Sequence, residues 1–154
     1  METKSNVVAL VDVNNFFVSC ERVFLPALEK RPVAVLSNND GCVVARSNEV
    51  KALDVPMAVP FYQVREIFEK HKVVVFSSNF QLYGDMSDRV MSILSRFSPY
   101  QEIYSIDECF LDFSGFSHLN LTEYAHEIRN CFRQWIGLPI SIGIAPTKTL
   151  AKLA

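Results

Sequence analysis

Three carboxylates stand at positions suited to metal-dependent chemistry. Asp12 lies near the end of an apolar, β-branched segment, residues 7–13, which predicts a buried strand. Asp107 and Glu108 are adjacent and join two further short apolar segments. If all three segments are neighbours in one sheet, the carboxylates meet at one edge, where such costly charges favour a bound cation. Oxygen ligands alone favour Mg²⁺ or Mn²⁺ over zinc, and two such ions about 4 Å apart are the apparatus of nucleotidyl transfer.

Each carboxylate also has an ordinary structural explanation. Asp12 can cap the helix that we expect just after it. Asp107 and Glu108 can form a solvated hairpin turn. The spacing alone leaves both interpretations open beside the metal site.

Two adjacent aromatic residues, Phe16 and Phe17, follow Asp12 by four and five positions. Neighbouring side chains on a helix point about 100° apart, so both rings cannot face one core. One ring is therefore expected to line something else, unless the helix has a broad apolar face.

Basic residues occur in two places where they can hold phosphate. Lys148 and Lys152 are four residues apart at the start of a helix, hence on one face. Arg46 and Lys51 flank a helix start at Ser47. A solvated helix face explains either pair equally well.

The elements that must position these residues alternate between strands and helices. We expect strands at 7–13, 33–36, 42–45, 73–76, 102–105, 109–113 and 140–145. We expect helices at 14–23, capped by Asn14 or Asn15, then at 47–53, 61–70, 81–97 and 122–135, the last capped by Thr122. A further helix opens at Pro146-Thr147 and has no stop signal before Ala154, so we expect the chain to be cut inside it. This order favours an α+β fold, in which helices pack on one face of a sheet, with a small α/β insert.

Composition narrows the class of protein. The chain has 154 residues, of which 49% are hydrophobic and 21% charged, which suits one globular domain or a domain with a small subdomain. Its net charge is −2, so the chain lacks the excess of basic residues that is typical of a free-standing nucleic-acid binder. The four cysteines have no CxxC spacing, so we expect reduced, buried thiols. No membrane-length apolar run or signal-peptide pattern is present, and we expect a cytoplasmic protein.

Five segments together resemble the Y-family translesion DNA polymerases, most closely their UmuC-type branch. No single segment is specific, but all five occur in order between residues 7 and 154. They are residues 12–21, 37–43, 78–87, 104–108 (Tyr-Ser-Ile-Asp-Glu) and 143–154.

The resemblance implies a palm-type mixed or antiparallel sheet with two Mg²⁺ ions, for which Mn²⁺ may substitute. By similarity, Asp12 and Asp107 would bridge the two ions. Glu108 would complete the site of the ion that activates the primer 3′-OH, and the backbone carbonyl of Val13 would be a further ligand. The palm would comprise residues 1–13 and 79–154, and the fingers insert residues 14–78.

The resemblance also implies how the nucleotide is held. Phe17 falls at the steric-gate position, where an aromatic ring excludes a ribose 2′-OH, and Phe16 would pack beside the incoming sugar. Lys152 matches the lysine that holds the triphosphate. Lys51 and Asn48 stand where many members carry an arginine and a tyrosine, so the phosphate grip is expected to be weaker.

The implied activity is template-directed DNA synthesis across lesions, in SOS-type DNA repair and mutagenesis. Its substrates would be primer–template DNA and dNTPs. Its partners would be a UmuD-like subunit, a recombinase filament and a sliding clamp, with no membrane. The family's thumb and basic DNA-gripping domain are missing, so we expect this catalytic fragment to be inactive alone. Two alternatives remain: a truncated binding or decoy protein, and a nucleotide cyclase, against which the steric gate argues.

Overall fold

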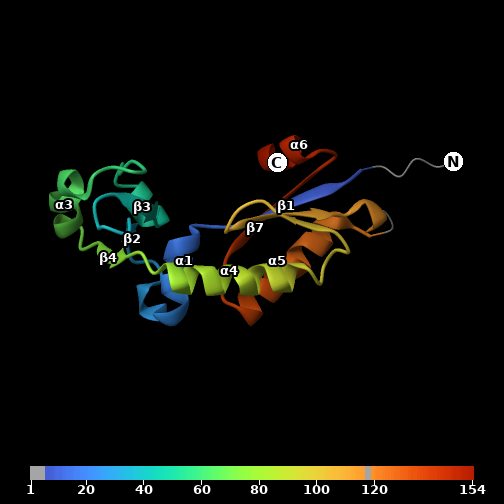
Figure 1. Ribbon diagram of the computed structural model, residues 1–154, viewed down its shortest axis with the longest axis horizontal. Coiled ribbons are helices and arrows are strands. Elements are labelled where there is room, and N and C mark those ends of the chain that lie inside the picture. The colour runs from blue at the N-terminus through green and yellow to red at the C-terminus, as the bar shows by residue number, and fades with distance from the viewer. Residues whose placement is uncertain (1–5, 117–118) are drawn as a thin grey trace. The chain divides into compact units, whose positions relative to one another are not determined.

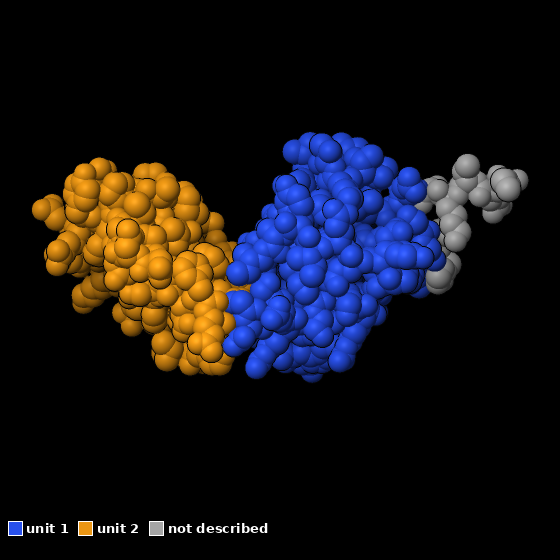
Figure 2. Space-filling view, viewed as in Figure 1, with its two compact units in different colours: residues 1–14, 84–154 blue, residues 15–83 orange. Residues whose placement is uncertain are grey.

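The computed structural model describes residues 6–116 and 119–154. The chain divides into two compact units (Figure 2). Unit 1 comprises residues 1–14 and 84–154, and unit 2 comprises residues 15–83. Residues 1–5 of the expected palm lie outside the described residues. Within the described ranges, no helix combines the length and apolar character needed to cross a lipid bilayer.

Unit 1 is built on a four-stranded antiparallel sheet with the order β5-β6-β1-β7. The two central strands are β1 (Val8–Val13) and β6 (Glu108–Asp112). The edges are β5 (Gln101–Ile103) and β7 (Ile140–Ala145). The expected α+β fold is thereby confirmed, with strands close to the predicted ranges.

Helices lie on both faces of this sheet, so the prediction that they pack on one face was wrong for α6 (Figure 1). On one side are α4 (Phe80–Leu94) and α5 (Leu121–Trp135), facing a layer of buried strand side chains that includes Val11, Cys109 and Leu111. On the other side is α6 (Lys148–Leu153), whose Ala151 packs against Leu10 and Phe110. Because strand side chains alternate between faces, Asp12 and Glu108 belong to the α6 face with Leu10 and Phe110.

Unit 2 contains a three-stranded sheet with the order β3-β2-β4. The central strand β2 (Val33–Leu36) is fully buried, antiparallel to β3 (Val43–Arg46) and parallel to β4 (Val74–Ser77). The helices of the unit are α1 (Phe16–Phe24), the short α2 (Asn48–Lys51) and α3 (Phe61–Lys70). A 3₁₀ turn at Pro26–Leu28 follows α1, and another, at Ser114–Phe116 in unit 1, follows β6.

The helix caps agree with the sequence prediction at some positions and differ from it at others. Ser47 and Thr147 cap α2 and α6 as their sequence positions indicate. The cap of α5 is Asn120, whose Oδ1 accepts from the backbone of Thr122 and Glu123, so the prediction of Thr122 was wrong. Asn15 occupies the cap position of α1 in a left-handed conformation (φ 47°), but its side chain makes no cap bond.

All four cysteines are free, as expected. Cys20 and Cys109 are buried as predicted, whereas Cys42 and Cys131 are partly exposed, so the prediction of burial was wrong for these two. Burial, reinforced by the nearby Glu21 charge, raises the pKa of the Cys20 thiol to about 12.

Gly143 in β7 lets α6 approach the sheet closely. A Cβ at this position would lie 2.3 Å from the Ala151 carbonyl oxygen, a backbone atom that cannot swing aside. The absence of a side chain therefore fixes the distance between α6 and the sheet face that carries Asp12 and Glu108.

We predict that Gly143→Ala destabilises unit 1 and displaces α6. Forcing a methyl group into a packed backbone contact costs about 1–3 kcal/mol. Gly84→Ala is the matched control, because a Cβ there meets nothing within 4 Å and alanine favours the helix by about 0.5–1 kcal/mol. Urea denaturation should lower the midpoint for the first variant and not for the second; equal midpoints would contradict this role of Gly143.

Candidate active site

The register of β1 against β6 places two of the predicted carboxylates side by side. Asp12 lies directly opposite Glu108, and on its other side it lies opposite Ser141 of β7. The next residue, Val13, donates its backbone N–H to the Asp107 carbonyl at 2.9 Å. All three predicted acidic residues thus occupy adjoining backbone positions at one end of the sheet.

Asp107 is held by contacts that sequence reasoning missed. Its Oδ1 accepts a hydrogen bond from Ser105 Oγ at 2.9 Å. The neighbouring Ile106 carbonyl accepts from Ser87 Oγ of α4 at 2.5 Å. Ser87 and Ser105 both lie within the motif segments. However, nothing in the sequence indicates which atom either hydroxyl bonds.

The three carboxylates have the right donor chemistry for a divalent ion, but their side chains are not arranged to bind one. Asp12, Asp107 and Glu108 are all partly buried and offer only oxygen donors, which Mg²⁺ prefers. In the described part of the chain, however, no three Asp, Glu, His or Cys side chains are gathered closely enough to hold a metal ion. The fold brings the backbones of Asp12, Asp107 and Glu108 next to one another, but their side chains do not converge on one point.

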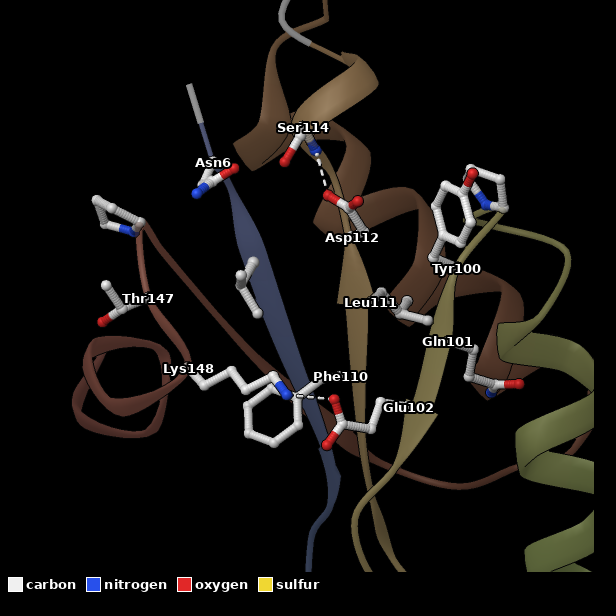
Figure 3. Close-up of a pocket in the computed structure, with 13 residues that line it drawn as sticks. Asn6, Tyr100, Gln101, Glu102, Phe110, Leu111, Asp112, Ser114, Thr147 and Lys148 are labelled. Atoms are coloured by element: carbon white, nitrogen blue, oxygen red, sulfur yellow. Dashed lines mark hydrogen bonds and ion pairs between the residues drawn. The ribbon is translucent and has the colours of Figure 1, made fainter. Parts of the chain in front are cut away.

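Both lysines of α6 lie over aromatic rings on the same face of unit 1. The Lys148 ammonium is 5.5 Å from the centre of the Phe110 ring and pairs with Glu102. Figure 3 shows this pair across the Phe110 ring, beside a cavity of about 740 Å³. The Lys152 ammonium is 4.5 Å from the centre of the Tyr104 ring.

The two predicted nucleotide-contacting aromatics of unit 2 differ in exposure. Phe16 is only 4% exposed and belongs to the core. Phe17 is partly exposed and stacks on Tyr83, with ring centres 4.4 Å apart and planes tilted by 17°. Tyr83 donates its hydroxyl to Glu21 at 2.9 Å, and burial together with this bond raises the pKa of the phenol. Phe80 meets the Phe17 ring edge-on.

The Lys51 ammonium is held by the side-chain amide of Asn15, which is itself bonded to the amide of Asn48. Its ammonium donates to Asn15 Oδ1 at 2.7 Å, and Asn15 Nδ2 donates to Asn48 Oδ1 at 3.2 Å. The left-handed backbone of Asn15, which asparagine tolerates better than most residues, presents its amide to α2. Arg46, the other basic residue at this helix, is directed elsewhere and donates to the Val55 carbonyl.

Comparison with known proteins identifies the family. A profile described as the impB/mucB/samB family matches residues 11–154. The chain belongs to this family. Protein ImpB of Salmonella typhimurium is 53% identical and protein UmuC of the same species 52% identical, each over 95% of this chain and 35% of the relative. The chain thus spans about a third of the length of these impB/mucB/samB relatives.

The fold agrees with a solved polymerase structure. The insertion ternary complex of Dbh DNA polymerase matches with a TM-score of 0.86 and 26% identity, covering 96% of this chain and 44% of that one. The Y-family resemblance seen in the sequence motifs is therefore confirmed at the level of family and fold.

We predict that Asn15→Gly releases the Lys51 side chain. Glycine keeps the left-handed backbone and removes only the amide. ¹³C relaxation should then show the Lys51 ε-methylene becoming as mobile as that of exposed Lys70 on α3. Asn48→Ala is the control, since the bond from Lys51 to Asn15 survives it. A Lys51 side chain that is already mobile in the native chain would contradict the assignment.

Proposed function

We propose that the chain is the palm and fingers portion of a translesion DNA polymerase that joins dNMP units to a primer by two-metal nucleotidyl transfer. In this proposal the palm is residues 1–13 and 79–154 and the fingers are residues 14–78, bounds close to those of units 1 and 2. The observation that carries it is the pairing of Asp12 with Glu108, next to Asp107, at one end of the unit 1 sheet. Family membership supports it, as does the likeness to the insertion ternary complex of Dbh DNA polymerase.

The proposed metal ligands are Asp12, Asp107, Glu108 and the backbone carbonyl of Val13. When bound, two Mg²⁺ ions would favour ionisation of the primer 3′-OH and neutralise charge on the triphosphate. The contribution of the chain is to hold oxygen donors on one rigid sheet end. Small side-chain rotations must complete the set, because the described side chains do not yet converge.

The proposed nucleotide contacts are two lysines and two phenylalanines. Lys152 and Lys51 would hold the triphosphate, since each presents an ammonium that no carboxylate in the described residues neutralises. Phe17 would exclude the ribose 2′-OH, because its ring is partly exposed and braced by Tyr83. Phe16 would pack beside the sugar and next to this ring, with 5.8 Å between the ring centres.

The remaining parts of the proposal concern the whole protein. They rest on the resemblance alone: SOS-type function in the cytoplasm, with primer–template DNA, a UmuD-like subunit, a recombinase filament and a sliding clamp as partners. A net charge of −2 gives these 154 residues little attraction for DNA phosphates. Primer extension by this chain alone is therefore expected to be negligible.

We predict that the chain binds Mn²⁺ through the acidic end of the sheet. Asp107→Asn should weaken binding at least several-fold, because an amide replaces an anionic oxygen donor. Asp112→Asn is the matched control: it makes the same charge change in β6, and its Oδ1 can still accept from Ser114. Isothermal titration calorimetry compares the three proteins. Equal weakening by both substitutions, or by neither, would contradict the site.

A second prediction concerns the sugar. With Mn²⁺ present, Phe17→Ala should strengthen binding of ATP relative to dATP by roughly tenfold, because removing the ring admits the 2′-OH. Phe80→Ala removes a neighbouring ring that is 53% exposed and should leave the ratio unchanged. Competition titrations measure the ratio; if it is the same in native and Phe17→Ala protein, Phe17 is not the gate.

A further inference from the structure

We propose that Tyr104 positions the Lys152 ammonium for phosphate, whereas Lys148 serves as an anchor for α6. This inference rests on the proposed function, in which Lys152 contacts the triphosphate. It assigns a role to an aromatic residue that lies outside the set of predicted site residues.

The two lysines of α6 are seated on a pair of mutually supporting rings. Lys148 lies over Phe110 and Lys152 over Tyr104, at 5.5 and 4.5 Å from the ring centres. The rings themselves meet edge to face, with 5.6 Å between centres and planes at 71°. Because the lysines are four residues apart, one helix face meets one continuous aromatic surface.

The two lysines differ in their charge partners. Lys148 forms an ion pair with Glu102 of β5, so its charge is neutralised where it stands (Figure 3). Among the described residues, no carboxylate lies within ion-pairing distance of Lys152. The structure therefore gives Lys148 an anchoring contact and leaves the charge of Lys152 available to an anion.

A ring is a suitable support for an ammonium that must bind phosphate. The face of an aromatic ring attracts a cation without cancelling its charge. A lysine ammonium has three N–H donors, and those that point away from the ring remain free for phosphate oxygens. Holding the long side chain in place beforehand also reduces the entropy lost when the anion binds.

Tyr104 also connects Lys152 to the acidic segment. It precedes Asp107 by three residues, and its backbone N–H donates to the Glu108 carbonyl at 3.1 Å. The segment that carries the carboxylates therefore also carries the ring beneath the lysine. Gly143 completes the arrangement, since it admits the backbone of α6 to this face.

Lysine-labelled ¹³C NMR of the intact chain tests the position of the ammonium. In the native protein, the Lys152 ε-methylene should be shifted upfield by the Tyr104 ring current. Tyr104→Leu should abolish the shift, and Tyr104→Phe should retain it. Tyr100→Leu is the matched control, because this β5-adjacent tyrosine is 70% exposed and lies under neither lysine of α6. An unshifted Lys152 in the native protein would overturn the inference.

Titration of the same proteins with inorganic tripolyphosphate, without metal, tests the consequence. Tyr104→Leu should weaken binding about two- to five-fold, the strength of an exposed cation–ring contact, while Tyr104→Phe and Tyr100→Leu should bind like the native chain. If Lys152→Ala weakens binding but Tyr104→Leu does not, Tyr104 has no positioning role. Failure of the proposed function has a different signature. The upfield shift persists, yet Lys152→Ala binds tripolyphosphate unchanged, which overturns the phosphate role of both residues.

Discussion

The antiparallel pairing of β1 with β6 is the constraint on which the candidate site depends. A single register places Val11 opposite Cys109 in the core and Asp12 opposite Glu108 on the other face. A slip of one residue would exchange the two faces, exposing the apolar side chains and burying the acidic ones. The free energy that stabilises the core therefore also fixes the backbone positions of Asp12 and Glu108.

The two faces of this sheet differ in role: one packs against the core and the other carries the candidate site. The face toward α4 and α5 is a close-packed apolar layer that stabilises unit 1. The face toward α6 carries Asp12, Glu108 and both ring-supported lysines. α6 contacts the sheet at Gly143. The same rigid surface therefore positions both the carboxylates and the lysines of the candidate site. In the proposed function, metal and phosphate would be held at a spacing that the sheet determines.

The sequence predicted the features that depend on local pattern. Alternation and β-branched runs located the strands, and Ser47 was identified as a cap because its side chain bonds only three residues ahead. Contacts between distant segments could not be predicted in the same way. Nothing in the order of residues indicates that Asn15 binds Lys51, 36 positions away, instead of capping its own helix. The ring beneath Lys152 was missed for the same reason, since Tyr104 meets it only after α6 folds across the sheet. The Y-family motifs indicated which residues matter; the tertiary structure showed what supports them.

The central claim is that the end of the β1–β6 pair binds divalent metal for nucleotidyl transfer. Crystals of the chain soaked with Mn²⁺ and a non-hydrolysable dNTP test it most directly, because anomalous scattering locates each ion independently of any side-chain interpretation. We predict anomalous peaks between Asp12 and Asp107, within coordination distance of Glu108 or the triphosphate. Peaks only elsewhere, or none at saturating Mn²⁺ with nucleotide bound, would rule out a metal site at this end of the sheet.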